Sequence, residues 1–257
     1  IAMGMFFNNA ACDVYIGKGA GKKLLYDIDE AKNSVQILSP FLSPFLIKKL
    51  IHLHKKGIKI TLITTDEIED FYGEREQNIH QLILQDRQLD NQAEVQRNRW
   101  KAVKRRLNWT ILLLTLTCLA IELLAWDLRS FLLLVPIGFL CLTSRWLHEK
   151  INSKRIYQYS YHQLFPFKVF VSPGKSGYGD TYLHAKIYLI DDEIAYLGSL
   201  NFTGCGTRSN YETRIRITDK PSVQEIRKEF HRLFHEEELP EVDIQTWGRT
   251  LYCEPIN

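Results

Sequence analysis

Two long apolar runs near the middle of the chain limit its possible folds most strongly. The first is 109–126, broken only by the acid Glu122, and the second is 131–146, after a short polar turn. Each run is close to the ~17-residue lower limit for a helix that crosses a bilayer. Tryptophans at the run ends are typical of an interfacial aromatic belt. We therefore expect a two-helix transmembrane hairpin, with helices at about 109–126 and 128–146.

Basic residues flank the hairpin on both sides. They are Arg97, Arg99, Lys101, Lys104, Arg105 and Arg106 before it, and Arg145, Lys150, Lys154 and Arg155 after it. By the positive-inside rule, we expect an integral, two-pass membrane protein, anchored in the lipid bilayer through about 109–146, with its catalytic domain in the cytoplasm. A soluble helical hairpin packed in a dimer core is the alternative. Glu122 favours that alternative, since an acid inside a membrane is costly and needs a partner.

The amino-acid composition excludes few classes of protein. The chain has 257 residues, 45% of them hydrophobic, and its net charge of +3 gives no argument for or against a polyanionic partner. Its five cysteines are scattered and form no CxxC pair, which is typical of reduced thiols rather than of disulfides or a zinc site. No cluster of His, Cys, Asp or Glu has the spacing of metal ligands, so we expect neither a metal nor a cofactor.

Strand and helix patterns alternate before the hairpin and return after it. Before it, we expect strands at 12–17, 34–40 and 58–65, helices at about 21–32 and 44–56, and a long polar helix at 74–107. After it, we expect a helix at 150–163, strands at 165–171, 182–191, 193–199 and 211–218, a glycine-rich loop at 172–180 and a helix at 223–235. This alternation predicts a layered α/β domain with one sheet built from both sides of the insertion.

The chain is therefore expected to contain one domain interrupted by a helical insertion. We place the first part of the domain at 5–73, starting at Met5, the insertion at 74–160, the second part at 161–237 and a C-terminal tail at 238–257. An even number of membrane crossings returns the chain to the same side, as such a split domain requires.

Residues with chemical potential are concentrated after the hairpin, beginning with the segment HAKIYLID. His184 and Lys186 lie two residues apart in a predicted strand, so both side chains project from the same face. Further polar or small residues follow at Asp191, Gly198, Ser199, Asn201, Asn210 and Glu212. Cleavage of a phosphodiester needs a nucleophile, a proton donor for the leaving oxygen and fixed positive charge around the phosphoryl oxygens. A neutral His184 can be the nucleophile, and Lys186 can supply the charge.

The spacing HxK, four residues, Asp, six residues and GSxN resembles the HKD signature of the phospholipase D superfamily. The resemblance implies a layered α/β/α sandwich with a mixed sheet, here interrupted by the long helix and the hairpin. It also implies a phosphohistidine intermediate on His184. Lys186 is then expected to bind a non-bridging phosphoryl oxygen.

The resemblance also implies roles for the remaining members of the signature. Asn201 and Ser199 are expected to add neutral donors, and Glu212 is expected to orient the His184 ring. Gly198 and Asn210 are counted with the phosphate-binding and supporting residues. Asp191 is expected to fix a turn or pair with a buried cation rather than to touch substrate.

Only one complete HKD element is present. The pair His54 and Lys56 also matches HxK, but no Asp or GSxN follows it at the required offsets. The chain therefore resembles the single-motif branch of the superfamily, which includes the Nuc-type endonucleases and the mitochondrial Zucchini type. This branch implies a homodimer in which a twofold axis brings His184 and Lys186 of two chains face to face.

Three functions stay open from the sequence. A membrane-anchored endonuclease is the leading hypothesis, supported by the single-motif resemblance and by basic residues at Lys175, Arg208, Arg214 and Arg216. The second is a phospholipase D or cardiolipin-type lipid hydrolase or transphosphatidylase, for which Tyr157, Tyr159 and Tyr161 would lie near headgroups. The third is a dimeric phosphate-binding sensor or scaffold, which would have no need of an intact nucleophile.

Overall fold

The computed structural model describes residues 10–66, 80–125, 132, 134–171, 182–235, 241 and 243–256. The expected turn between the two apolar runs and the glycine-rich loop at 172–180 lie outside the described residues. The chain forms two compact units. The first comprises Ile1–Leu84 and Tyr161–Leu251, and the second comprises Gln85–Ser160 and Tyr252–Asn257.

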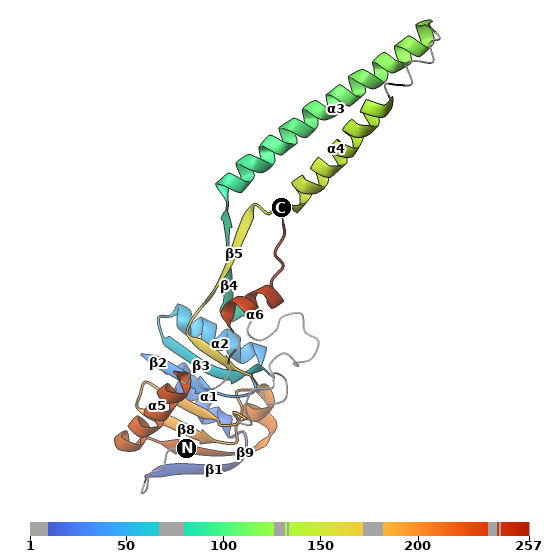
Figure 1. Cartoon of the computed structure of the whole chain (residues 1–257). Coiled ribbons are helices and arrows are strands. Elements are labelled where there is room, and N and C mark those ends of the chain that lie inside the picture. The colour runs from blue at the N-terminus through green and yellow to red at the C-terminus, as the bar shows by residue number, and fades with distance from the viewer. Residues whose placement is uncertain are drawn as a thin grey trace. The chain divides into compact units, whose positions relative to one another are not determined.

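A seven-stranded mixed sheet forms the centre of the first unit (Figure 1). Its strands, in spatial order, are β1 (Cys12–Lys18), β9 (Tyr211–Ile217), β8 (Ile194–Gly198), β7 (Ile187–Ile190), β2 (Ser34–Leu38), β3 (Lys59–Thr65) and β6 (Phe167–Phe170). The pairs β2–β3 and β3–β6 are parallel, and the remaining neighbours are antiparallel. Strands from both sides of the insertion belong to this one sheet, so the predicted mixed α/β fold is confirmed.

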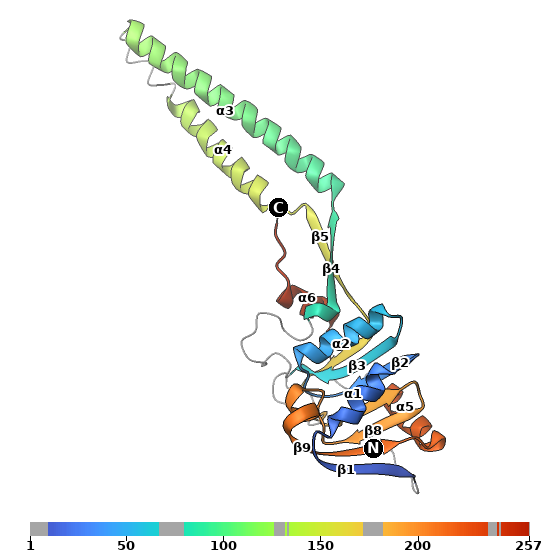
Figure 2. The ribbon, with the colours of Figure 1, turned by 180° about the vertical axis from the view of Figure 1, so that it is seen from behind.

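Helices cover both faces of this sheet, as the opposite views in Figures 1 and 2 show. The helices of the first unit are α1 (Gly21–Asp29), α2 (Pro44–Lys55), α5 (Lys220–Phe234) and α6 (Ile244–Leu251), with a short π-helix η4 (Cys205–Ser209) and a 3-10 turn η2 (His80–Leu82). On α5, Val223, Ile226 and Phe230 pack with Ala195 of β8 in one apolar cluster. The next residue, Tyr196, reaches α1 on the opposite face, since successive side chains of a strand alternate.

The second unit consists mainly of two helices and most of a two-stranded ladder. The ladder pairs β4 (Ile83–Leu89) with β5 (Tyr157–Gln163), and the helices are α3 (Asn91–Ala125) and α4 (Leu134–Ser153). Asp90 caps α3, because its carboxylate accepts from the backbone N–H groups of Gln92 and Ala93, each at 3.0 Å.

Two sequence expectations are wrong in this region. The helix expected at 74–107 begins only at Asn91, and residues 83–89 before it form a strand. The helix expected at 150–163 ends at Ser153, and residues 157–163 form the partner strand. Each of these strands exists because it pairs with the other, and that pairing is remote in sequence.

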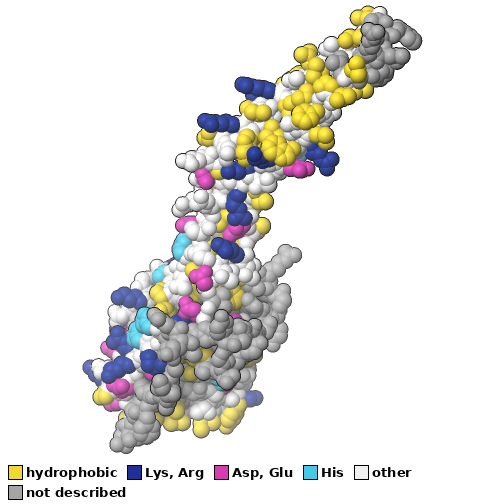
Figure 3. All heavy atoms as spheres, viewed as in Figure 1, with side chains coloured by type: hydrophobic (Ala, Val, Ile, Leu, Met, Phe, Trp, Pro, Cys, Tyr) yellow, Lys and Arg dark blue, Asp and Glu magenta, His cyan; other side chains and the backbone are white. Residues whose placement is uncertain are grey.

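One helix in the described part of the chain meets the length and composition of a membrane span. It covers Asn91–Leu124, and only 6% of its most apolar window is buried. Figure 3 shows hydrophobic side chains gathered along the upper part of the helix pair, with Lys and Arg side chains below them. A second span at 128–146 is not shown, since α4 begins at Leu134 and continues through the polar residues up to Ser153.

An ion cluster around the buried Asp27 joins α1 to the sheet. The Asp27 carboxylate accepts from Lys23 at 2.6 Å, from the Tyr196 hydroxyl at 2.5 Å and from the Arg216 guanidinium at 3.0 Å. Burial opposes ionisation of Asp27, but the three donors outweigh it and hold the pKa of this carboxyl below its ordinary value. The charged form therefore stabilises the fold above that ordinary value, and this contribution is lost as the pH falls through the lowered pKa.

We expect Asp27→Asn to lower the free energy of unfolding by about 2 kcal/mol at neutral pH, because the partly buried Arg216 loses its nearer charged acceptor and keeps only Asp13, at 3.5 Å. The difference from the unchanged protein should shrink as the pH drops below the ordinary Asp value of 3.8. Denaturant unfolding of the full chain in detergent measures both effects. Asp29→Asn is the matched control, since Asp29 is half exposed and its ion pair with Lys49 should contribute under ~1 kcal/mol. Equal losses for the two variants would contradict the assignment.

Candidate functional site

The candidate site begins with an irregular segment that leads into β7. Residues 182–186 are not in a strand, so the expected strand at 182–191 is shortened to Ile187–Ile190. His184 and Lys186 nevertheless lie on the same side of the chain. The Lys186 ammonium is 2.9 Å from Nδ1 and 3.0 Å from Nε2 of His184, and it donates to the His184 carbonyl oxygen at 2.7 Å.

These two side chains differ sharply in their exposure to solvent. Lys186 is only 5% exposed, whereas the His184 ring is exposed and stacks on Tyr182 at a centroid distance of 5.6 Å. Burial lowers the pKa of the Lys186 ammonium, and the nearby Glu212 carboxylate partly offsets this effect. An accessible imidazole therefore lies against a buried cation, which is a suitable pair for binding and attacking a phosphoryl group.

Glu212, near the start of β9, is held by two other residues of the predicted signature. It is buried, and it accepts a short hydrogen bond from the Ser199 hydroxyl and one of 3.1 Å from the Asn210 amide. Ser199 in turn accepts from the Thr213 backbone N–H at 3.0 Å. No hydrogen bond joins Glu212 to His184 among the described residues, so the orienting role expected for Glu212 stays a prediction.

Gly198 allows the strands β8 and β9 to approach each other at this point. Its φ of 152° is one that residues with a side chain rarely adopt, and a Cβ placed on it would lie 2.0 Å from the Thr213 carbonyl oxygen. This close approach brings Ser199, the next residue, to Glu212. The glycine of the GSxN element therefore has a steric function.

The loop after β8 is fixed from three directions. The buried Tyr188 hydroxyl of β7 donates to the Leu200 carbonyl oxygen at 2.6 Å, and the Phe202 backbone N–H donates to Ser39 at 2.9 Å. A Cβ on Gly206 would lie 2.5 Å from the Asn201 carbonyl oxygen, so η4 packs directly on the loop. The side-chain oxygen of Asn201 is buried and has no hydrogen-bond partner among the described residues.

Asp191 lies at the opposite end of β7 from His184. Its carboxylate accepts from three consecutive backbone N–H groups, those of Lys32, Asn33 and Ser34, at 2.9, 2.6 and 2.9 Å. Asp191 thus ties the β7–β8 turn to the loop before β2, which is a structural role.

The basic residues predicted near the substrate are largely engaged elsewhere. Arg216 belongs to the Asp27 cluster, and Arg214 donates to the Ala20 carbonyl oxygen at 3.1 Å. The Arg208 guanidinium lies 5.0 Å from the centroid of the Phe45 ring. The remaining one, Lys175, lies outside the described residues. The sequence could not identify these partners, because they are remote along the chain.

Tyr188 and Tyr182 are supporting residues that the sequence did not reveal. A tyrosine two residues after Lys186, in a strand that is otherwise aliphatic, was the only available signal for Tyr188. Burial raises the pKa of the Tyr188 hydroxyl, which keeps this group a neutral donor to the loop.

Comparisons with known proteins bear on this site. Residues 140–234 match the family described as "Cardiolipin synthase, PLD-like domain", and the candidate site residues all lie within this stretch. Residues 140–234 are therefore similar to a phospholipase D-like domain. No curated protein matches the sequence.

Three solved structures align with most of the chain at low sequence identity. NucT from Helicobacter pylori has a TM-score of 0.47 and 13% identity, with coverage of 91% of this chain and 100% of that one. Nuc from Salmonella typhimurium, a phospholipase D family member, has a TM-score of 0.41 and 12% identity, with coverage of 90% and 99%. Phosphatidylserine synthase from Haemophilus influenzae has a TM-score of 0.43 and 15% identity, with coverage of 95% and 43%.

We expect Gly198→Ala to lower the free energy of unfolding by about 3 kcal/mol, because the new Cβ forces β8 away from the Thr213 carbonyl group. Gly138→Ala is the control, since a Cβ there has open space in α4. Denaturant unfolding in detergent compares the two. Tolerance of Gly198→Ala would mean that the strands do not need this close approach.

Proposed function

We propose that the protein is a membrane-anchored phosphodiesterase that acts through a phosphohistidine on His184 at a homodimer interface, with nucleic acid as its substrate. The observation that carries this proposal is the contact between the exposed His184 ring and the buried Lys186 ammonium, inside the phospholipase D-like stretch.

The proposed reaction has two steps. An unprotonated ring nitrogen of His184 attacks phosphorus, and the bond from phosphorus to the leaving oxygen breaks as that oxygen receives a proton from an acid. Water then attacks the phosphohistidine and gives up a proton to the group that acted as the acid, which returns the free imidazole, the protonated acid and a phosphomonoester. Lys186 stabilises the negative charge that develops on a non-bridging oxygen in both steps.

The proton donor is proposed to be His184 of a second copy of the chain. A single HKD element provides one such histidine per chain, and two roles need two imidazoles. The exposure of the His184 ring leaves it accessible to a symmetry-related copy. We therefore infer a twofold axis near His184, with a single shared cleft.

Glu212 is proposed to stabilise the charged state of the site. Its electrostatic effect favours the protonated form of Lys186, and its own buried charge is stabilised by hydrogen bonds from Ser199 and Asn210. Asn201 is proposed to contact the phosphoryl group from the fixed loop after β8.

Membrane anchoring is proposed from α3, whose apolar stretch is exposed, and a cytoplasmic domain is proposed from its basic flank. Lipid phosphodiester cleavage is the second candidate function. It is favoured by the description of the matched family as a cardiolipin synthase domain. Endonuclease activity stays the leading proposal, because the chain resembles the single-motif branch.

The full chain in detergent should cleave labelled single-stranded DNA or RNA, and EDTA should leave the rate within about twofold. Lys186 provides the positive charge that a metal ion otherwise supplies. Cardiolipin vesicles are incubated in parallel. Turnover of cardiolipin alone would transfer the proposal to the lipid candidate. Loss of all activity in EDTA, with recovery on adding magnesium, would contradict the mechanism.

Mixing the unchanged protein with an excess of His184→Ala subunits tests the shared site. Heterodimers retain one of two required imidazoles and should lose at least ~10²-fold in rate. After subunit exchange, the measured activity should follow the square of the fraction of unchanged chains. His52→Ala, an exposed histidine of α2, is the matched control and should leave activity unaltered in every mixture. Activity linear in the unchanged fraction, after verified exchange, would show a complete site in each chain.

A further inference from the structure

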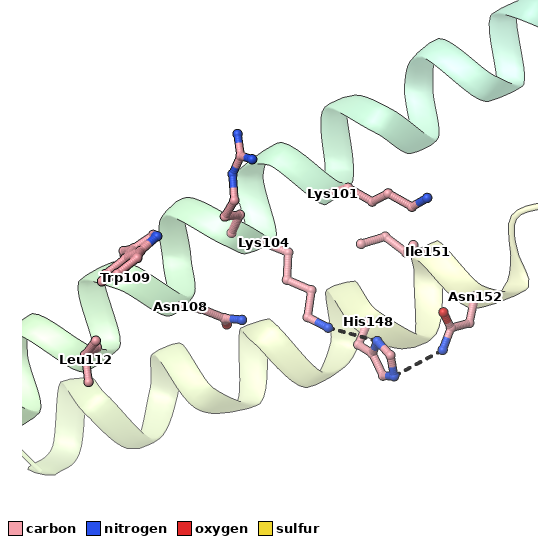
Figure 4. Close-up of a pocket in the computed structure, with 9 residues that line it drawn as sticks. Lys101, Lys104, Asn108, Trp109, Leu112, His148, Ile151 and Asn152 are labelled. Atoms are coloured by element: carbon pink, nitrogen blue, oxygen red, sulfur yellow. Dashed lines mark hydrogen bonds between the residues drawn. The ribbon is translucent and has the colours of Figure 1, made fainter.

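A cavity of about 560 Å³ lies between α3 and α4, within the second unit. Its lining includes Lys101, Lys104, Arg105 and Trp109 of α3 and His148 of α4. Figure 4 shows Lys104 reaching from α3 toward His148. Lys101 lies three and four residues before Lys104 and Arg105, and Trp109 lies four residues after Arg105, so these positions share one side of the helix. No group of the candidate phosphodiesterase site belongs to this cavity.

The polar part of the cavity carries an excess of positive charge. It contains the cations Lys101, Lys104 and Arg105, and no acidic side chain is among the described residues that line it. The three cations also form no ion pair with an acidic residue within the described part of the chain. An anion bound here would therefore meet positive charge that no protein carboxylate neutralises.

Hydrogen-bond donors also outnumber acceptors around His148 in this cavity. The Lys104 ammonium lies 2.9 Å from Nδ1 of His148, and the Asn152 amide nitrogen lies 3.1 Å from Nε2. A neutral imidazole accepts a hydrogen bond at only one of its two nitrogens. The neutral ring can therefore accept a hydrogen bond from only one of these two nitrogens at a time. An oxyanion, which accepts at several positions, is suited to such a site.

The other part of the lining is apolar and lies where α3 enters its hydrophobic stretch. Trp109 is 67% exposed, and Leu112 follows it along the same cavity. Nearby, the Lys150 ammonium lies 4.7 Å from the ring centroids of both Trp100 and Trp146. Tryptophan and lysine at the end of an apolar helix are typical of the headgroup level of a membrane. Cations at one end and apolar surface at the other match the two parts of a phospholipid.

We propose that this cavity binds the phosphate of an anionic glycerophospholipid headgroup. Lys101, Lys104 and Arg105 contact the phosphate oxygens, and His148 donates to them when Lys104 turns to the ligand. The acyl chains lie along Trp109 and Leu112. The proposal rests on the membrane anchoring inferred above, and it is independent of the phosphodiesterase reaction.

The test uses the delipidated full chain in a neutral detergent, titrated with dioctanoyl phosphatidylglycerol and followed by native mass spectrometry. We expect one tightly bound lipid per chain, with dioctanoyl phosphatidylcholine at least ~10-fold weaker because its headgroup has no net charge. The double variant Lys104→Gln/Arg105→Gln should weaken phosphatidylglycerol binding at least ~10-fold. Arg99→Gln/Arg106→Gln removes the same charge from the same helix outside this cavity, and it should change binding less than about threefold.

Three outcomes would overturn the inference. Equal binding of the two lipids would exclude recognition of net headgroup charge, and equal losses in the two double variants would exclude a localised site. Displacement of phosphatidylglycerol by inorganic phosphate at equal concentration would exclude the acyl contribution and leave a simple anion site. A full chain that stays in solution without detergent would instead refute the anchoring on which the site depends. DNA or RNA cleavage measured on the same samples keeps the phosphodiesterase proposal separate.

Discussion

The antiparallel pairing of β2 with β7 is the constraint on which the first unit depends. In this register Val35 pairs with Ile190 and Leu38 with Ile187, which joins chain segments from the two sides of the insertion at the centre of one sheet. Both strands are almost entirely buried, and each buried aliphatic side chain contributes roughly 1.5–3 kcal/mol relative to its exposed state. The chain must therefore leave the sheet before the insertion and re-enter it afterwards at neighbouring points. The β4–β5 ladder meets this condition. At its two ends the Leu164 N–H donates a backbone hydrogen bond to the Leu82 carbonyl oxygen, and the Asp90 N–H donates one to the Ile156 carbonyl oxygen.

The same short strand sets the positions of the chemical groups. Because β7 begins at Ile187, Lys186 is fixed at the end of the strand, beside the irregular segment that exposes His184. At the other end, Asp191 is anchored by backbone N–H groups of the loop before β2. Between them, Tyr188 holds the loop that carries Asn201. The four residues between Lys186 and Asp191 in the HKD spacing are therefore the four residues of β7. The strand places Lys186 at one end and Asp191 at the other.

Local and non-local features of the sequence differed in how well they could be predicted. The alternating pattern predicted the mixed sheet, because the period of side chains in a strand is a local property. The ladder formed by 83–89 and 157–163 was missed, since neither strand is stable without its remote partner. Arg216 was expected near substrate, but the buried Asp27 binds it. The charge of an arginine cannot distinguish a buried ion pair from a phosphate-binding site, because the side chain meets negative charge in both.

The arrangement of charge explains why a buried lysine is useful in the proposed reaction. Burial makes the protonated form of Lys186 less favourable, and the Glu212 carboxylate compensates for part of that loss. Glu212 is itself buried, and the donors Ser199 and Asn210 stabilise its charge. The cation and its supports are therefore in place before any phosphate arrives, so little reorganisation is needed when negative charge develops. In the described residues, the buried oxygen of Asn201 is the part of this arrangement without a hydrogen-bond partner. An unsatisfied buried acceptor costs about 1–3 kcal/mol, and a donor from a second chain would recover that energy only in the dimer.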